Sequence, residues 1–419
     1  MTDLGGLYSR KMKNMTQSKS RWVVAHWGSR DDYQLPIALQ ETGELHRFVT
    51  DWYTHLDNRI VNAFLESAPR SIRAVLARRY RDELPSRLVK DIKLFGLLRM
   101  FLKTDALDSE LSKLLGERAA RVANASGSNL LITSYYGWAA FPKLASHAKK
   151  VLYQIHPHPL FLRRLYEACG SELDPVAEFS SELEMNSSQE YVMRWGQESL
   201  DADLVIAASS FTRKSLMEVG VRPEKIRIVP YGVDGRIFRN DIATPSGPPK
   251  VLFVGQATSR KGFEHLLNVW KSSDHRGAEL HIVSGGAAKF ETEHSDTSIT
   301  WHGRLSFAAL VELMNKADLL VLPSIAEGFG HVLLQSLSCG TPILCSDATA
   351  GPDLLDGWES GFIFPSQDWN RLASQLDYWL SNVDRLRRLR GAARERAESF
   401  SWEKFREGIR EACNAAITQ

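Results

Sequence analysis

The chain has 419 residues, of which 43% are hydrophobic, 24% charged and 10% aromatic, and its formal net charge is +2. This composition is typical of a globular protein of two or three domains, and the small net charge gives no reason to expect a nucleic-acid partner. The four cysteines form no C-x-x-C pair. Their spacing favours reduced thiols over a disulfide framework or a zinc site.

The chain begins with polar residues, and residues 1–20 contain no apolar core of the length found in a signal peptide. No apolar run approaches the roughly 18 residues of a membrane span. We therefore expect a flexible tail over residues 1–20 and a cytoplasmic protein.

Short apolar runs in the first half, separated by amphipathic stretches, predict buried parallel strands. These runs lie at Trp22–His26, Arg47–Thr50, Leu130–Ser134, Val151–Ile155, Leu204–Ala208 and Ile226–Val229. Between Val49 and Leu130 the pattern predicts a long, mostly helical insertion.

Two groups of polar or aromatic residues follow strands of this half. Arg30, Asp31 and Asp32 could contact an acceptor or form a charged turn that caps the next helix. The aromatic group of Tyr135, Tyr136 and Trp138 fits both stacking on an acceptor sugar and packing in the core. Both alternatives stay open for each group.

The segment 70–103 within the insertion is strongly basic. It holds ten basic and three acidic residues, with a cluster of apolar residues in its second part. A basic amphipathic helix of this kind can lie on an anionic membrane surface, whereas a solvated helical insertion explains the charge equally well.

The second half alternates strands and helices more regularly, and this alternation predicts a doubly wound α/β domain. Strands are expected at Val251–Gly255, Leu280–Ser284, Leu319–Pro323, Pro342–Cys345 and Phe362–Phe364; helices are expected at Phe263–Lys271, Ser306–Asn315, His331–Cys339, Trp369–Leu380, Arg385–Glu398 and Ser401–Gln419. A linker rich in proline, glycine and serine, residues 240–250, separates the halves. We predict a first α/β domain over 1–240, a second over 241–400 and a C-terminal helix over 401–419 that packs back on the first domain.

Two strand–loop–helix segments of the second half have the residues of an anion site. One carries Glu327 and two glycines before a helix whose first amides, at His331 and Val332, can bind an anion, with Gln335 one turn further on. The other places Arg260 and Lys261 at a strand end, where they could bind a diphosphate. Taken singly, each segment is also explained by an ordinary turn with solvated charges.

Residues 250–365 resemble the GT-B glycosyltransferases of glycosyltransferase family 4, also called group 1 glycosyltransferases. The matching segments are PYGVD (230–234), FVGQATSRKGFEHLL (253–267), HGRLS (302–306), ADLLVLPSIAEGFGHVLLQSLSCGTPIL (317–344) and GFIFP (361–365). The resemblance implies the GT-B fold, in which two Rossmann-like doubly wound domains face a central cleft. It also implies that the domain over 1–240 binds the acceptor and that the domain over 241–400 binds the nucleotide sugar.

The resemblance also implies roles for single residues. Arg260 and Lys261 match the basic pair that binds the donor diphosphate, and Glu327 matches the first acid of an E-x7-E motif that contacts the transferred sugar. The turn that binds sugar and phosphate corresponds to Phe329, Gly330, His331 and Val332. The second acid of the motif, assigned to the ribose, is replaced by Gln335, which can still hydrogen-bond hydroxyls.

Three further positions are compared with the family. Gln256 stands where many members carry an arginine, so Arg260 is expected to bind more of the phosphate. Gly28 lies in the first loop, which approaches the donor or the acceptor. His156 fits the histidine found near the transferred sugar better than His158 does, although a histidine at this point could instead satisfy a hydrogen bond in the core.

We therefore expect a retaining, hexosyltransferase-like enzyme that moves a sugar from a nucleotide diphosphate to an acceptor hydroxyl, in glycan or envelope polysaccharide synthesis. It is expected to need no metal and no cofactor, and its partners are a nucleotide-sugar donor and a glycan or lipid-linked acceptor. A location at the inner face of the membrane would suit such an acceptor. The alternatives are a nucleotide-sugar epimerase of GT-B type and a non-catalytic nucleotide-sugar-binding protein. A nicotinamide dehydrogenase is disfavoured because no G-x-G-x-x-G follows the first strand of either half.

Overall fold

The computed structural model describes residues 20–56, 69, 73, 76–92, 105–169, 179–239, 245–293, 296–356 and 362–418. Residues 1–19 of the predicted tail and residues 70–72, 74–75 and 93–103 of the basic segment lie outside these ranges. The described residues group into two compact units. The first runs to Leu152 and includes 201–203 and 413–418, and the second consists of Tyr153–Leu200 and Leu204–Ala412.

Within the described residues the strands form one sheet of seven and one of six, in the orders β3-β2-β1-β4-β5-β6-β7 and β10-β9-β8-β11-β12-β13. The seven strands are β1 (Trp22–Ala25), β2 (Leu45–Thr50), β3 (Val89–Asp91), β4 (Asn129–Thr133), β5 (Lys150–Gln154), β6 (Leu204–Ala207) and β7 (Ile226–Ile228). The six are β8 (Lys250–Val254), β9 (Glu279–Val283), β10 (Ile299–Trp301), β11 (Leu319–Leu322), β12 (Ile343–Ser346) and β13 (Ile363–Phe364). The strand pairs are parallel, which fits the predicted doubly wound architecture.

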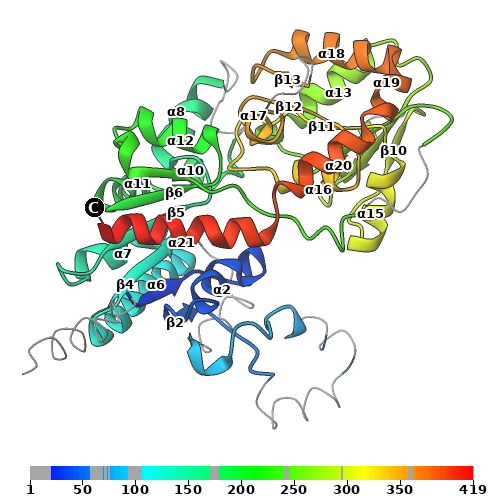
Figure 1. The fold of residues 1–419 in the computed structure, drawn as a ribbon. Coiled ribbons are helices and arrows are strands. Elements are labelled where there is room, and N and C mark those ends of the chain that lie inside the picture. Colours follow the sequence, from blue (N-terminus) through cyan, green and yellow to red (C-terminus); the bar gives the residue numbers. More distant parts are fainter. Residues whose placement is uncertain are drawn as a thin grey trace, which may run out of the picture. The chain divides into compact units, whose positions relative to one another are not determined.

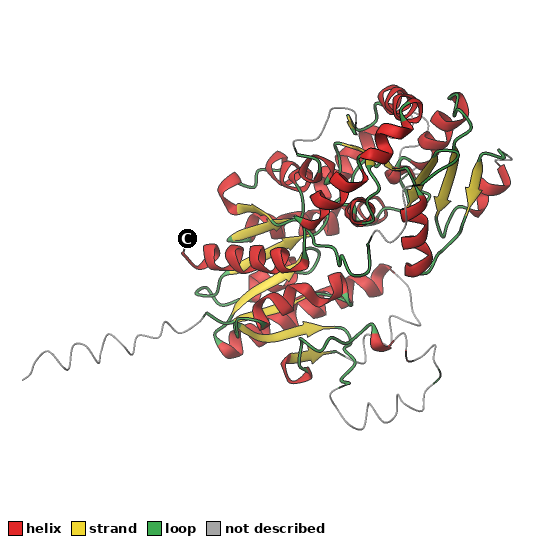
Figure 2. Ribbon diagram, turned by 45° about the vertical axis from the view of Figure 1, so that its right-hand side comes forward, coloured by secondary structure: helices red, strands yellow, loops and turns green. Residues whose placement is uncertain are grey.

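Helices alternate with most of the strands along the chain and flank both sheets (Figure 2). Before β8 the helices are α2 (Gln34–Gln40), α6 (Asp105–Ser126), α7 (Gly137–Ala140), α8 (Pro159–Cys169), α10 (Leu183–Asn186), α11 (Gln189–Asp201) and α12 (Ser210–Glu218), with short 3-10 turns at Arg30–Tyr33, Ser86–Leu88, Phe141–Lys143 and Pro223–Lys225. After β8 they are η5 (the 3-10 turn Ser259–Lys261), α13 (Phe263–Ser272), α14 (Ala288–Glu293), α15 (Phe307–Lys316), α16 (His331–Ser338), α17 (Gly351–Leu354), α18 (Trp369–Ser381), α19 (Val383–Arg388), α20 (Arg390–Glu398) and α21 (Trp402–Thr418).

The central strands are buried on both sides, as their unbroken apolar sequences require. Every residue of β1, β6, β11 and β12 is buried. In the first unit α6 packs on β1, β2 and β4, and in the second α16 packs on β11 and β12. The α20 helix lies beside α16 (Figure 1). Together these layers form the cores from which the site loops project.

The arginine that begins α20 holds two helix ends. The Arg390 guanidinium is buried and donates to the carbonyl oxygens of Asn315 and Ala317 at the end of α15, each at 2.9 Å. It also donates to the Cys339 carbonyl oxygen at the end of α16, at 3.3 Å. The last carbonyls of a helix have no partner inside the helix, so this side chain fixes the α15 and α16 ends by satisfying them.

Three local predictions differ from the structure. Residues 86–91 of the predicted helical insertion form a 3-10 turn and the edge strand β3, which pairs with β2 through Phe48 and Val89. The edge strand β10 is not among the predicted strands. The charged helix expected over 385–398 is divided at Leu389 into α19 and α20. Each edge strand has three residues with a polar one among them, too few to show the pattern of a buried strand.

Candidate active site

The two predicted site loops lie side by side in the second sheet. One follows β8 and the other follows β11, and these neighbouring strands are where the strand order reverses. Ligands of doubly wound sheets bind beyond the carboxyl ends of the strands at such a switch point. The amide of Ile325 donates to the Arg260 carbonyl oxygen at 2.7 Å, which ties the loops together.

A glycine makes this close approach available. Gly262 has a φ of 64° and follows Lys261 directly. A Cβ at this position would lie 2.1 Å from the carbonyl oxygen of Pro323 at the end of β11. The turn that carries Arg260 and Lys261 can therefore reach β11 only with glycine here.

Arg260, Lys261 and Glu327 form one buried ion cluster. The Arg260 Nη1 atom donates to Glu327 Oε2 at 3.1 Å and to the Ala326 carbonyl oxygen at 3.2 Å. The Lys261 ammonium contacts the same Glu327 oxygen. The side chains of the three residues are 15%, 12% and 11% exposed. The sequence places these residues 66 positions apart, and the fold brings them into contact.

The cluster is ionised. Burial by itself would raise the pKa of Glu327, but Lys261 and Arg260 outweigh it and hold the pKa at about 2. For Arg260, burial acts to lower the pKa, whereas Glu327 and a further carboxylate, Glu182, raise it above its ordinary value. A carboxylate and two cations are therefore fixed in a poorly solvated place, where their fields are stronger than in water.

The Glu327 loop is held on its other side by neighbouring backbone. The Glu327 amide donates to the Ala348 carbonyl oxygen at 2.9 Å. The Gly328 carbonyl oxygen accepts from Ser209 Oγ at 2.6 Å and from Thr212 Oγ1 at 3.1 Å, at the start of α12. A Cβ on Gly328 would lie 2.1 Å from the Ile155 carbonyl oxygen, so the loop contacts the segment after β5.

The two histidines of that segment have different surroundings. His156 follows Ile155 and is half-buried, and its Cα would lie 3.1 Å from a Cβ placed on Gly328, the residue after Glu327. His158 is buried, and its ring bonds the Gly196 carbonyl oxygen through Nε2 and the Leu160 amide through Nδ1. Burial lowers the pKa of His158 to about 4. Of the two, His156 lies beside the ion cluster and His158 supports the core.

The start of α16 lies next to the cluster in the chain. Gly330 has a φ of 84° and precedes the first helical residue. Phe329 is buried, whereas His331, Val332 and Gln335 are half-buried and share one side of the helix. The first amides of a helix have no partner within it and carry its positive dipole end. An anion bound beside Arg260 would therefore also meet this helix start.

A tyrosine from the PYGVD segment packs under this helix start. The Tyr231 ring lies 4.2 Å from the His331 ring and 5.2 Å from the Phe329 ring. On its other side it stacks on Phe405 of α21 at 5.8 Å. Ser401 begins α21 and caps it, because its Oγ accepts from the Lys404 amide. Sequence comparison pointed to this segment but not to the positioning role of Tyr231.

The remaining predicted positions lie apart from the cluster or in the first unit. Gln256 is exposed in the loop after β8. Gly28, in the first unit, has a φ of 73°, and its amide donates to Asp51 Oδ1 at 2.9 Å. The Asp51 carboxylate is paired with Arg79 at 3.0 Å. The Gly28 amide is therefore already held by a carboxylate within its own unit.

The charged turn after β1 has unusual backbone geometry. Asp31, Asp32 and Tyr33 all have left-handed φ values, between 49° and 63°. Asp32 forms an ion pair with Arg81, and Tyr33, which precedes the first residue of α2, makes no side-chain capping bond. In the aromatic group, the Trp138 indole donates to the Tyr135 carbonyl oxygen at 3.2 Å, and the Tyr136 ring lies parallel to that of Trp27 at 6.5 Å.

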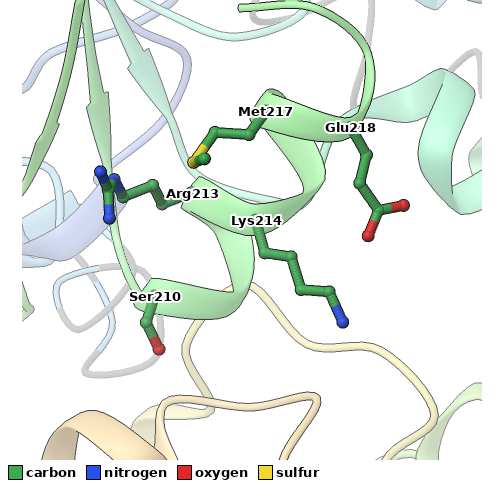
Figure 3. Close-up of a pocket in the computed structure, with 5 residues that line it drawn as sticks. All are labelled: Ser210, Arg213, Lys214, Met217 and Glu218. Carbon is green, nitrogen blue, oxygen red and sulfur yellow. The ribbon is translucent and has the colours of Figure 1, made fainter. Parts of the chain in front are cut away.

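Two cavities of the second unit adjoin α12. One of about 420 Å³ runs along the helix and is lined by Ser210, Arg213, Lys214, Met217 and Glu218 (Figure 3). The other has a volume of about 540 Å³. Its lining includes Ile325, Asp347 and Gln367 from the loops at the carboxyl ends of the second sheet, and Phe161, Phe211 and Lys214. The linings of these two cavities contain no predicted site residue.

Comparison with known proteins identifies the region that builds this site. Residues 234–396 match the model of the family described as "Glycosyl transferases group 1". The matched region contains Arg260, Lys261, Glu327 and the whole of α16.

Curated relatives extend the similarity beyond the matched region. An alpha-maltose-1-phosphate synthase of Mycobacterium tuberculosis is 26% identical over 323 residues, which cover 67% of this chain and 78% of the relative. An MMP alpha-(1->4)-mannosyltransferase of Mycolicibacterium hassiacum is 30% identical over 213 residues, 48% of this chain and 51% of the relative. The chain is a glycosyltransferase, as its sequence predicts.

Solved structures confirm the fold. A sucrose-phosphate synthase from Thermosynechococcus elongatus aligns with a TM-score of 0.63 and 20% identity, covering 94% of this chain and 98% of that one. The Anabaena protein HepE, solved in complex with UDP-glucose, aligns with a TM-score of 0.59 and 15% identity, covering 94% and 99%. The predicted GT-B fold of two Rossmann-like halves is therefore confirmed. In the described residues, no helix combines the length and apolar character that a membrane span requires.

Glu182 is a charged contact of the cluster that sequence reasoning missed. It lies just before α10, and its Oε2 accepts from Arg260 Nε at 2.8 Å. The local sequence, SSELEMN, shows no motif and no strand end. Only the contact between segments 78 residues apart gives Glu182 a place in the site.

Proposed function

We propose that the chain transfers a sugar from a nucleoside diphosphate to an acceptor hydroxyl, with retention of configuration and without a metal ion. The observation that carries the proposal is the buried cluster of Arg260, Lys261 and Glu327 at the switch point of the second sheet. The relatives named as a synthase and a mannosyltransferase, and a structural neighbour solved with UDP-glucose, support a donor of this class. Resemblance to family 4 supports retention.

Arg260 is suited to bind the diphosphate. Its Nε and Nη1 atoms donate to Glu182, Ala326 and Glu327. Among the described residues none accepts from Nη2, which leaves both N–H groups of that nitrogen for an anion. Charge-assisted bonds from an arginine nitrogen to phosphate oxygens are strong.

The leaving group is stabilised by charges that are already in place. When the bond between the anomeric carbon and the phosphate oxygen breaks, negative charge grows on the diphosphate. Arg260, Lys261 and the first amides of α16 face that charge without reorganising, and fixed charges of this kind supply the largest share of many rate enhancements. They supply the positive charge that a metal ion provides in other transferases.

Glu327 orients the transferred sugar in this proposal. Its carboxylate stays ionised at neutral pH because Lys261 and Arg260 hold its pKa at about 2, against the effect of burial. An ionised carboxylate accepts hydrogen bonds from sugar hydroxyls and cannot donate a proton. We therefore assign it a binding role and not that of a general acid.

The configuration at the anomeric carbon is retained when the acceptor attacks this carbon from the same face that the leaving group departs from. The acceptor oxygen bonds to the anomeric carbon, and the acceptor proton passes to the departing phosphate oxygen. His156, half-buried beside Glu327, is proposed to contact the transferred sugar. Gln335, on the half-buried side of α16, is proposed to bind the ribose as hydrogen-bond donor and acceptor.

The acceptor is proposed as a glycan or a lipid-linked glycan in envelope polysaccharide synthesis. Contact of residues 70–103 with an anionic membrane at the inner face is proposed on the charge of that segment. The first domain, over residues 1–240, is proposed to bind this acceptor, with Gly28 in the first loop.

The test is product analysis with UDP-, GDP- and ADP-linked hexoses, each with and without a glycan and lipid extract. We expect one nucleoside diphosphate to be released together with a glycosylated product, and this release to be lost in Arg260→Ala and Glu327→Ala. Arg371→Ala, which removes an exposed arginine of α18, is the matched control and keeps the activity. An altered sugar formed from the donor alone would support the epimerase, and donor binding without any turnover would support the non-catalytic binding protein.

A further inference from the structure

The carboxylate of Glu182 is the part of the ion cluster that the proposed reaction does not use. It contacts Arg260 Nε at 2.8 Å, and the two side chains are 14% and 15% exposed. Burying a carboxylate is costly unless it is paired and hydrogen-bonded. A buried acid beside the arginine that binds the diphosphate therefore needs an explanation.

The backbone holds Glu182 firmly. Its amide donates to the Phe179 carbonyl oxygen at 2.9 Å, and its own carbonyl oxygen accepts from the amides of Met185 and Asn186, both at 3.1 Å. The Phe179 ring stacks on Tyr166 with centroids 4.7 Å apart. The turn before α10 is thus closed by hydrogen bonds and anchored by a buried aromatic pair.

The same aromatic pair supports the donor loop. Phe179 and Tyr166 are fully buried in a cluster with Ile325 and Ala326. These two residues directly precede Glu327, and the Ala326 carbonyl oxygen accepts from Arg260. One packed cluster therefore positions both carboxylates and the carbonyl that surround the guanidinium.

The contacts fix the orientation of the arginine. A guanidinium is a rigid planar group with five N–H donors. Glu182 binds the Nε edge, and Glu327 and Ala326 bind Nη1. With Nε and Nη1 both bound, the plane of the guanidinium is fixed, and the direction in which Nη2 points is fixed with it.

The position of Glu182 also argues against competition with the donor. A carboxylate that competed with the diphosphate for Arg260 would pair with Nη2, the nitrogen that the diphosphate is proposed to contact. Glu182 instead pairs with Nε, the nitrogen nearest the main chain. A diphosphate at Nη2 does not have to displace it, and the orientational order of a long side chain is established before the donor binds.

We propose that Glu182 is a positioning residue of the donor site, which holds the Arg260 guanidinium so that Nη2 faces the donor diphosphate. The inference rests on the proposed function, because it assumes that Arg260 binds that diphosphate. It adds to the donor site a residue from outside the matched region 234–396.

The test is calorimetric titration of the full chain with UDP, GDP and ADP, using the nucleotide that binds the parent. We expect Glu182→Ala to weaken binding roughly tenfold, because small misplacements of a positioning contact have effects of this size or larger. Glu182→Gln is expected to weaken it less, since the amide oxygen can still accept from Nε. Glu190→Ala is the matched control, because it removes an exposed glutamate that pairs with Arg194 on α11, and it leaves binding unchanged.

A double variant separates positioning from a general structural effect. If Glu182 acts through Arg260, adding Glu182→Ala to Arg260→Ala weakens binding no further, whereas a structural role would weaken both backgrounds alike. Unchanged or tighter binding in both Glu182 variants, with binding lost in Arg260→Ala, overturns the role of Glu182 and leaves the proposed function intact. Unaltered binding in Arg260→Ala, or no binding to the parent, overturns the proposed function and this inference with it.

Discussion

Replacing Glu327 by glutamine tests the ion cluster through its pH dependence. Burial acts to raise the pKa of Glu327, but Lys261 and Arg260 bring it from an ordinary value of 4.5 to about 2. A difference of this size corresponds to roughly 3 kcal/mol of stability, at about 1.4 kcal/mol for each pH unit. Because the folded pKa lies below the ordinary one, this stabilisation is complete above about pH 4.5 and is lost as the pH falls toward 2.

The assay is urea unfolding followed by tryptophan fluorescence for the parent and Glu327→Gln from pH 7 to pH 3. At pH 7 the variant is expected to unfold with about 3 kcal/mol less free energy, because two cations lose the carboxylate they share. Between pH 6 and pH 3 the advantage of the parent should shrink by about 2 kcal/mol. Glu190→Gln, at an exposed pair, should stay close to the parent throughout. An advantage of the parent over Glu327→Gln that is the same at pH 6 and pH 3 would refute the reasoning.

Three further changes test how the fold supports the site. Arg390→Ala removes the buried guanidinium that caps α15 and α16 and should lower the free energy of unfolding by about 3 kcal/mol. The control Arg388→Ala, at an exposed position, should lower it by less than about 0.5 kcal/mol. Equal effects of the two changes in urea unfolding would contradict the capping role. The melting temperature of Gly262→Ala should be well below that of Gly247→Ala. Both glycines have a positive φ, but only at Gly262 would the new Cβ meet a carbonyl oxygen. Similar melting temperatures of the two variants would argue against that contact. His158→Ala removes two ring hydrogen bonds, so the variant should be about 2 kcal/mol less stable than the parent and bind the nucleotide with unchanged affinity. Weaker nucleotide binding at unchanged stability would instead give His158 a role in the site.

Much of the fold could be predicted from the sequence because its central strands are buried on both faces. The short apolar runs at β1, β6, β8, β11 and β12 are bounded by polar residues or glycine, and the structure has strands there. The edge strands β3 and β10 were missed because each has only three residues with polar ones among them, whereas the edge strands β7 and β13 belong to recognisable apolar runs. Strands that are buried along their whole length were therefore predicted more readily than strands with exposed polar residues, whatever the intrinsic strand preference of those residues.

The site shows the same division between local and distant information. Arg260, Lys261 and Glu327 lie in loops whose glycines and strand ends are visible in the sequence, and the fold joins them in one cluster. Glu182 lies in no local pattern, and its contact with Arg260 joins residues far apart in the chain. Tyr231 lies in the PYGVD segment, but its contact with His331 is visible only in the fold. His158 is buried against Gly196 and His156 is only half-buried. This difference depends on residues distant in the chain, so the sequence around the two histidines does not show it.

The central claim is that the Arg260 edge at the switch point binds the diphosphate of the donor. Phosphorus NMR titration of UDP, GDP and ADP with the parent and with Arg260→Ala tests it most directly, because the phosphates themselves are observed. We predict that both phosphorus resonances of one nucleotide shift on binding to the parent, and that the variant binds the same nucleotide at least about tenfold more weakly, as expected when a charge-assisted phosphate contact is lost. Equal affinities and equal shifts for the parent and Arg260→Ala would contradict the account.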